Sequence, residues 1–275
     1  MNEIMCIGQP FSVDHSSCSD LTPESFRWST NSKNCDTVVC IDAAIVGGFD
    51  SDDLPENRFA WLCESPVIVP DIYKTVSDYA EALLGYYTGI FTCDSQLAEQ
   101  HDRIHLISSG SNLPWTKDFQ IYEKTKNVSL VASHKNYTEG HKLRHSLAKE
   151  HSDKLDIVGS INGERVGDSL FDKMDGYRDY RFTVVIENCN HDTYYTEKLT
   201  DAFATGTIPV YWGTHNVCDI FNPDGIIMLT DDFDFSQLTE ELYQEKLDAV
   251  RDNFERVKNL KMADDELYEI IQPNC

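Results

Sequence analysis

The sequence predicts an α/β protein with two Rossmann-like domains, and three observations carry that prediction. Short apolar runs alternate with amphipathic stretches along the chain, a rhythm typical of βαβ units and a mostly parallel sheet. The chain has 275 residues, of which 41% are hydrophobic, enough for one or two domains with real cores. A stretch at 108–126 that carries Gly, Pro, Asn and Ser breaks the rhythm and suggests a linker.

The first half contains four runs that we expect to be strands and one that we expect to be a helix. The apolar runs at 36–45, 59–63, 89–92 and 104–107 have the length and composition of strands. The stretch at about 73–87 is amphipathic and predicts a helix.

The second half repeats the alternation and has its clearest signal at 182–186. The run FTVVI is continuous and β-rich, as expected for a central strand buried on both faces. A helix is predicted at 196–205, because Leu199, Ala202 and Phe203 share one face and Gly206 is a typical C-terminal stop. The remaining expected elements are strands at 128–132, 155–159 and 207–211, and helices at 141–151 and from 247 onward.

These elements predict a domain at 1–110, a linker at 111–127, a second domain at 128–246 and a helical C-terminal segment at 247–275. The last segment is strongly acidic, and a solvated helix face is the expected explanation. Two such domains would leave a cleft, and functional residues are expected just after the strands, beyond their carboxyl ends.

The composition excludes several classes of function. A net charge of −24 and an isoelectric point near 4.5 disfavour binding to nucleic acid or to anionic membranes. The nine cysteines form no CxxC pair, which argues against zinc and favours free thiols in a reducing compartment. Neither a signal-peptide pattern nor an apolar run long enough for a membrane span is found, so a cytoplasmic location is expected.

The first candidate site follows the central strand, in the polar loop at 187–198. Thr196 is a suitable N-cap, so the helix that it begins would present backbone N–H groups together with Lys198. A cation at this end of a helix opposes the helix dipole, and a bound phosphate would remove the conflict. The alternative is an exposed lysine with a solvated head.

A second basic group opens the helix expected at 141–151, again just past a strand. It contains Lys142 and Arg144 within the segment GHKLRH at 140–145. Two basic groups at equivalent strand ends of one domain predict a diphosphate site. The alternative for this group is an ordinary polar helix face.

The second half contains three further motifs: YRFTVVIEN at 180–188, YYTEKL at 194–199 and IPVYWG at 208–213. Together they resemble the glycosyltransferases of family 10, the α1,3/α1,4-fucosyltransferases. The family pattern is Phe-Glu-Asn, Tyr-x-Thr-Glu-Lys and Pro-Val-x-x-Gly, and Ile186 stands where the family usually has Phe. The resemblance covers about 128–235 well and the first half loosely.

The resemblance implies a GT-B type fold with an acceptor-binding domain first and a GDP-sugar domain second. It implies donor-site roles for Asn188, Tyr194, Glu197 and Lys198, with Glu197 on the ribose and Lys198 on the diphosphate. Glu187 is expected near the fucose.

The family also has a phosphate-binding arginine on the preceding helix, for which Arg144 is the nearest match and Lys142 the competitor. In the first domain the family places a catalytic glutamate in a Glu-Ser-Pro run after a Trp. The segment WLCESP at 61–66 fits that pattern and points to Glu64, whose alternative is an exposed loop carboxylate.

The implied activity is transfer of fucose from GDP-fucose, with inversion, to a hydroxyl of a glycan or glycoconjugate acceptor, α1,3 linkage being expected. No Asp-x-Asp follows a strand of the second domain, and fixed cations can serve the leaving group, so no obligatory metal or other cofactor is expected. Two alternatives stay open: a transferase for a different nucleotide sugar, and a non-catalytic descendant that binds glycan or nucleotide. The short chain is of the kind expected for a soluble bacterial or viral form.

Overall fold

The computed structural model describes residues 2–31, 33, 35–47, 54–161, 164–166 and 173–272. Two compact units form. Unit 1 comprises Met1–Trp115, His191–Tyr194 and Lys261–Cys275, and unit 2 comprises Thr116–Asn190 and Tyr195–Leu260. These limits differ from the predicted ones in that the short segment 191–194 and the last helix belong to unit 1.

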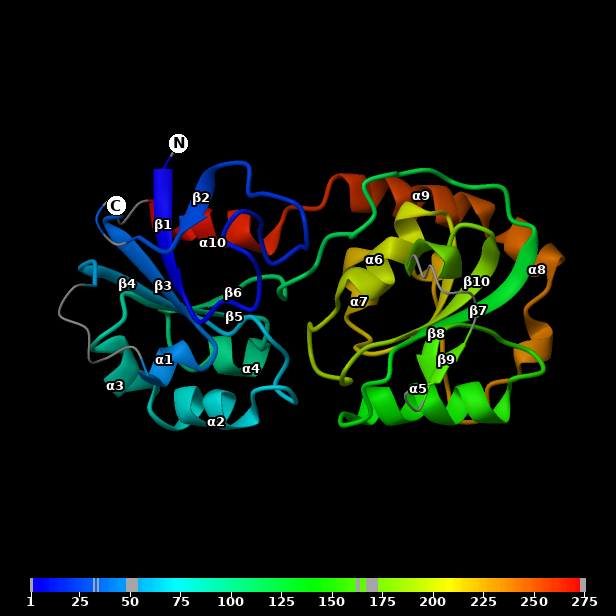
Figure 1. Cartoon of the computed structure of the whole chain (residues 1–275), viewed down its shortest axis with the longest axis horizontal. Helices are drawn as coiled ribbons and strands as arrows, with labels where there is room; N and C mark the ends of the chain where they lie inside the picture. Colours follow the sequence, from blue (N-terminus) through cyan, green and yellow to red (C-terminus); the bar gives the residue numbers. More distant parts are fainter. Residues whose placement is uncertain are drawn as a thin grey trace. The chain divides into compact units, whose positions relative to one another are not determined.

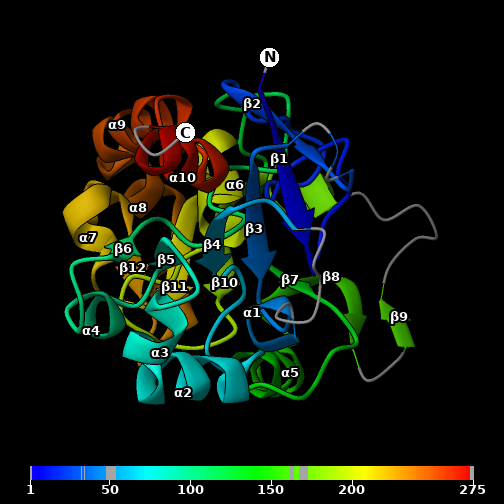
Figure 2. The same ribbon diagram turned by 90° about the vertical axis from the view of Figure 1, so that its left-hand side faces the viewer.

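Unit 1 is built on a parallel sheet with the strand order β2-β1-β3-β4-β5-β6 (Figures 1 and 2). Its strands are β1 (Asn2–Ile7), β2 (Phe26–Ser29), β3 (Thr37–Ile41), β4 (Asn57–Trp61), β5 (Gly89–Thr92) and β6 (Ile104–Leu106). Its helices are α1 (Ala44–Gly47), α2 (Pro70–Asp78), α3 (Ala80–Leu84), α4 (Ser95–Ala98) and α10 (Ala263–Ile271).

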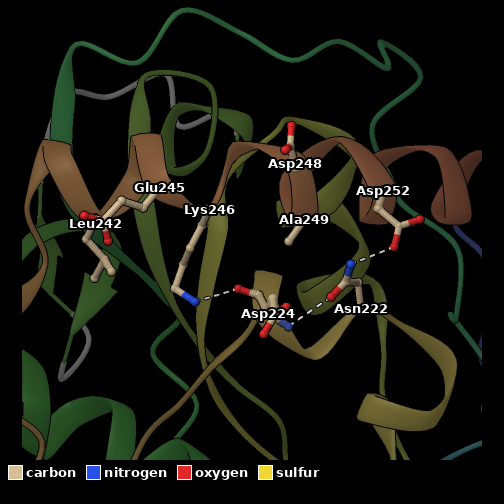
Figure 3. A pocket seen from close by; sticks show the side chains of 8 residues that line it. All are labelled: Asn222, Asp224, Leu242, Glu245, Lys246, Asp248, Ala249 and Asp252. Atoms are coloured by element: carbon tan, nitrogen blue, oxygen red, sulfur yellow. Dashed lines mark hydrogen bonds between the residues drawn. The ribbon is translucent and has the colours of Figure 1, made fainter.

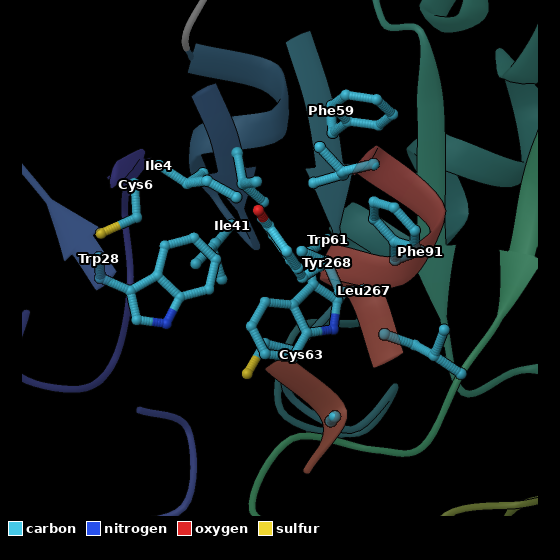
Figure 4. Packing of buried hydrophobic residues seen from close by; sticks show 14 of the residues in the cluster. Ile4, Cys6, Trp28, Ile41, Phe59, Trp61, Cys63, Phe91, Leu267 and Tyr268 are labelled. Atoms are coloured by element: carbon cyan, nitrogen blue, oxygen red, sulfur yellow. The ribbon is translucent and has the colours of Figure 1, made fainter. Parts of the chain in front are cut away.

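The sheet of unit 1 is covered on both faces, so successive residues of β3 enter different cores. Val38 and Cys40 pack with residues of α2 and α3, whereas Val39 and Ile41 pack with α10. The α10 face is rich in aromatic rings, including Trp28 and Trp61, which stack at 6.3 Å between ring centroids (Figure 4). Because the four residues from Val38 to Ile41 are all apolar, both faces of this strand can be buried.

Unit 2 has its own sheet in the order β12-β11-β10-β7-β8-β9, parallel except for the pair β8 and β9. Its strands are β7 (Lys126–Ala132), β8 (Asp156–Ile161), β9 (Glu164–Val166), β10 (Tyr180–Ile186), β11 (Ile208–Trp212) and β12 (Ile227–Met228). Its α-helices are α5 (Glu139–Glu150), α6 (Glu197–Ala204), α7 (Val217–Ile220), α8 (Glu240–Glu245) and α9 (Leu247–Lys258), and 3-10 turns lie at Lys173–Gly176, Pro223–Gly225 and Phe235–Gln237.

The central strand β10 alternates between two cores in the same way. Phe182, Val184 and Ile186 pack with residues of α5 and α8, and Val185 packs with α6 and α7. Parallel sheets are normally covered on both faces, so the predicted α/β class and the central position of 182–186 are confirmed.

Two expectations for unit 1 were wrong in detail, and two strands were not predicted. The unpredicted strands are β1 and β2; β1 pairs with both β2 and β3 and so completes the sheet. The strand expected at 36–45 ends at Ile41, because Asp42 takes a left-handed φ of 48° and α1 begins at Ala44. The helix expected at 73–87 is divided into α2 and α3 at Tyr79.

The expectation of a solvated acidic face was wrong for α10. Its first-turn carboxylates bind other segments of unit 1: Asp264 accepts from Trp28 Nε1 at 2.8 Å, Asp265 from the Glu24 N–H at 3.0 Å, and Glu266 from the Ser108 N–H at 2.7 Å. Acidic side chains are stabilised at a helix N-terminus, and here they also satisfy buried donors.

Candidate functional site

The next helix after β10 is α6, and its N-terminus brings together Glu187, Thr196 and Lys198. Thr196 is the N-cap, as predicted: its side chain accepts from the Lys198 N–H. Glu187 is fully buried, and its carboxylate accepts from the Thr196 N–H at 2.9 Å and from the Thr196 hydroxyl at 2.8 Å. A carboxylate of the chain therefore occupies the anion-favouring end of the helix.

Lys198 folds onto this carboxylate and is not a solvated lysine. Its Nζ lies 3.3 Å from Glu187 Oε2 and 2.7 Å from Thr196 Oγ1, and its side chain is 21% exposed. The conflict between Lys198 and the helix dipole is thus relieved within the protein by Glu187. The ammonium is held in place while part of it still faces solvent.

Glu197 belongs to a buried ion-pair cluster with Lys173 and Asp201. Lys173 Nζ lies 3.1 Å from Glu197 Oε1 and 2.7 Å from Asp201 Oδ2. Burial disfavours the charged form of Glu197, but Lys173 and Lys198 outweigh it and lower the pKa of Glu197 to about 2. Burial likewise opposes the charge of Lys173, and the two carboxylates overcome it and raise the pKa of Lys173.

The other basic group lies on α5, whose first turn abuts the end of β10. Gly140 donates its N–H to the Asn188 carbonyl at 3.3 Å, and a Cβ on Gly140 would meet the Glu187 carbonyl oxygen at 1.8 Å. Only glycine permits this approach. Arg144, one turn further along α5, donates from Nη2 to the Ile186 carbonyl at 3.0 Å. Arg144 and Lys198 therefore bind successive residues of the same strand end.

Lys142 lies on the opposite side of α5 from Arg144. Lys142 is exposed and Arg144 is 6% exposed, as expected for positions two residues apart on a helix of 3.6 residues per turn. The structure therefore brings Arg144, and not Lys142, to the end of β10 beside Glu187.

The pKa of His141 is lowered by burial and by the cationic side chains around it. Burial lowers its pKa first, and Arg144, Lys135, Lys198 and His145 lower it further, to about 4. Its Nδ1 accepts from the Thr138 N–H at 3.3 Å in a capping box, so the neutral ring carries its proton on Nε2. In a chain of net charge −24, this is a local concentration of cationic groups.

Tyr194 is buried and belongs to unit 1, and its N–H donates to the His191 carbonyl. His191 in turn binds Asp94 at 3.0 Å, a contact that lowers the pKa of Asp94 and raises that of His191. Asn188 is half-buried and remains with unit 2 through its bond to Gly140.

In unit 1, Glu64 follows β4 and is half-buried. Its backbone is fixed from two sides, because its N–H donates to Asp42 Oδ1 at 3.2 Å and its carbonyl accepts from the Tyr73 hydroxyl at 3.2 Å. Asp42 also accepts from the Cys63 N–H at 2.9 Å and is 6% exposed. Burial raises the pKa of Asp42 to about 6, and Glu64 adds to that rise.

Lys173 and Asp42 were not predicted from the sequence as members of these clusters. For Lys173 no signal existed, since its partners lie in α6. For Asp42 one signal was available: a polar residue directly after an apolar strand run, at the strand end where functional groups are expected.

A further hollow of about 590 Å³ in unit 2 contains none of the predicted site residues (Figure 3). It is lined by Asn222, Asp224, Leu242, Glu245, Lys246, Asp248, Ala249 and Asp252. Several of these residues bind one another, as in the 2.7 Å bond from Lys246 to the Asp224 carbonyl. Across the described residues, no three His, Cys, Asp or Glu side chains are grouped as metal ligands. None of the helices in the described ranges is long and apolar enough to cross a membrane.

Comparison with known proteins decides the family. The model of "Glycosyltransferase family 10 (fucosyltransferase) C-term" matches residues 121–262, more than half of the chain. The chain belongs to glycosyltransferase family 10. This match spans α5, β10 and α6, the elements that carry the cationic cluster.

Family 10 relatives share limited parts of the chain. The α-(1,3)-fucosyltransferase FucT of Helicobacter pylori is 33% identical over 90 residues, which are 31% of this chain and 19% of that protein. The α-(1,3)-fucosyltransferase 4 of Mus musculus is 27% identical over 183 residues, 65% of this chain and 40% of that protein. The matches thus span less than half of these relatives.

Solved structures support the fold over nearly the whole chain. The crystal structure of an α1,3-fucosyltransferase covers 92% of this chain and 80% of its own, with a TM-score of 0.54 and 16% identity. A crystal structure of α1,3-fucosyltransferase with GDP-fucose gives the same TM-score at 15% identity, covering 92% of this chain and 81% of its own. The predicted GT-B architecture of two Rossmann-like domains is confirmed.

Proposed function

We propose that the chain transfers fucose from GDP-fucose, with inversion, to a hydroxyl of a glycan or glycoconjugate, most simply in α1,3 linkage. The observation that carries the proposal is the cationic cluster at the end of β10, in a segment that belongs to family 10. The names of the relatives support the donor and the linkage.

In the proposed donor site, Lys198 and Arg144 bind the diphosphate of GDP. Both are held by the protein before any ligand arrives, Lys198 by Glu187 and Arg144 by the Ile186 carbonyl. Fixed cations stabilise the charge that develops on the departing GDP without reorganising. Because the protein supplies this charge, we propose that no metal ion is obligatory.

Glu197 is the proposed ligand of the ribose hydroxyls. Its low pKa keeps it ionised, as an acceptor of hydroxyl hydrogen bonds must be to bind strongly. Asn188 and Tyr194 are proposed as further donor-site residues. Glu187 is proposed near the fucose and, through its contact with Lys198, as the group that holds the ammonium in place.

Glu64 is the proposed general base that takes the proton from the acceptor hydroxyl. The residue is half-buried, and its backbone is held by Asp42 and Tyr73. Attack by the hydroxyl oxygen on C1 of fucose forms the new glycosidic bond as the bond to GDP breaks, and the proton passes to the carboxylate.

GDP-fucose, and GDP to a smaller degree, should raise the melting temperature of the protein, whereas UDP and free fucose should not. A ligand at 100 times its Kd stabilises the native state by about 2.7 kcal/mol. A thermal-shift panel of GDP- and UDP-sugars measures this directly. Stabilisation by UDP-sugars alone would favour a transferase for a different donor, and a panel without any effect would favour a non-catalytic descendant.

A further inference from the structure

Asp42 combines an unusual backbone conformation, burial and a backbone hydrogen bond to the neighbouring strand. It is a non-glycine residue with a φ of 48°, a conformation that costs roughly 1 kcal/mol or more for such residues. It is 6% exposed. It stands at the end of β3 with its N–H on the Trp61 carbonyl at 3.0 Å, so the strained position is fixed by the neighbouring strand.

The carboxylate of Asp42 is directed at the segment that contains Glu64. Asp42 Oδ1 accepts from the N–H groups of both Cys63 and Glu64, at 2.9 and 3.2 Å. A neutral amide oxygen could accept these two bonds equally well in geometry. The charge itself therefore calls for an explanation, because an ionised carboxylate is expensive to bury.

The ionisable groups that face Asp42 are Glu64, Cys63 and Tyr73. Burial raises the pKa of Cys63 and of Tyr73, so both are uncharged at neutral pH. Glu64 is the neighbour that can carry charge, and it has the same sign.

We propose that Asp42 is a positioning residue for Glu64, whose ionised carboxylate fixes the Cys63–Glu64 backbone through charge-assisted hydrogen bonds and so places the general base. This inference rests on the proposed role of Glu64. Because burial raises the pKa of Asp42 to about 6, these charge-assisted hydrogen bonds weaken as the pH falls through that value.

The effect of Asp42 ionisation on folding stability distinguishes a positioning role from a purely structural role. The pKa of Asp42 is raised from 3.8 in the unfolded chain to about 6 in the folded protein. Its stabilising contribution is therefore complete below pH 3.8 and is lost as the pH rises through about 6. At pH 7.5 the ionised side chain costs stability, so Asp42→Asn should melt no lower than the wild type.

The test compares wild type, Asp42→Asn and Asp36→Asn between pH 5 and pH 8, measuring melting temperature, GDP affinity and transfer from GDP-fucose. Asp36 is exposed at the start of the same strand and is the matched control. For Asp42→Asn we expect an unchanged GDP affinity, a melting temperature at pH 7.5 at or above wild type, and a kcat lower by roughly 10-fold or more. The ratio of wild-type to variant kcat should fall toward one as the pH falls from 7 to 5.

A wild-type rate in Asp42→Asn, or a rate ratio that is the same at every pH, overturns the inference, as does a lowered melting temperature at pH 7.5. The Glu64→Gln variant distinguishes failure of the positioning role of Asp42 from failure of the proposed general base. If Glu64→Gln loses transfer while Asp42→Asn keeps it, the inference alone fails. If Glu64→Gln keeps transfer, the proposed base is wrong.

Discussion

Replacing Glu64 by Gln should lower fucosyl transfer by roughly 10²–10⁴-fold, the usual contribution of a general base. Gln keeps the shape of the side chain and leaves the bonds of the Glu64 backbone to Asp42 and Tyr73 intact, but it cannot take the proton of the acceptor hydroxyl. GDP affinity should stay near wild type, because the proposed nucleotide ligands Lys198 and Arg144 are untouched. Single-turnover transfer and calorimetric GDP binding measure the two effects separately.

Glu99→Gln is the matched control, since Glu99 is an exposed glutamate of the same unit and should leave transfer unchanged. A fall in melting temperature together with GDP binding would instead show that Glu64 is a structural carboxylate of its turn. Near-normal transfer in a well-folded Glu64→Gln protein would remove the assignment, and Glu187 would then be the next carboxylate to test.

Replacing Lys173 by Met should destabilise unit 2 by about 3–5 kcal/mol, the usual cost of removing one partner of a buried ion pair. Lys173 is the cation between Glu197 and Asp201, whose side chains are 9% and 0% exposed. Without it, two buried carboxylates of like charge face each other. Burial raises the pKa of Asp201 although Lys173 lowers it, so loss of Lys173 removes the main group that favours the charged carboxylate. Urea unfolding measures the change.

Lys142→Met provides the comparison for this prediction, because Lys142 is an exposed lysine of the same unit and should change stability by no more than about 0.5 kcal/mol. Adding Asp201→Asn to Lys173→Met should restore part of the loss, since one of the two opposed charges is removed. Equal stabilities for the two lysine variants would show that the cluster is worth little.

The region around β10 and α6 could be predicted closely from the sequence. A continuous apolar run specifies a strand buried on both faces, and Thr196 and Gly206 specify where the following helix begins and ends. These signals are local, so the strand and the helix can be predicted without knowledge of the tertiary structure. They also placed Glu187, Glu197 and Lys198 at one end of one helix.

The first half was harder, because its shape depends on contacts between distant segments. The strand β2 has four residues and is defined by its pairing with β1. Asp264 and Glu266 of α10 bind donors more than 150 residues away in the chain, Trp28 Nε1 and the Ser108 N–H. From composition alone, these acidic residues are expected to form a solvated helix face.

Partner choice is the part of the site that the sequence could not supply. It left Arg144 and Lys142 as competitors, and only their burial on α5 distinguishes them. It predicted an external anion at Lys198, whereas Glu187 already provides an internal one. An ion pair between residues that are distant in sequence depends on the tertiary structure, so it cannot be predicted from the spacing of residues in a motif.

The most direct measurement of the central claim is calorimetric titration of GDP-fucose into wild type, Lys198→Ala, Arg144→Ala and Lys142→Ala, below the melting temperature of each. The account predicts that one molecule of GDP-fucose binds per wild-type chain. In the Lys198 and Arg144 variants, binding should weaken roughly 10-fold or more, because a charge-assisted phosphate contact is lost. Lys142→Ala should bind with wild-type affinity. Binding of a UDP-sugar in place of GDP-fucose, or undiminished affinity in folded Lys198→Ala and Arg144→Ala proteins, would contradict it.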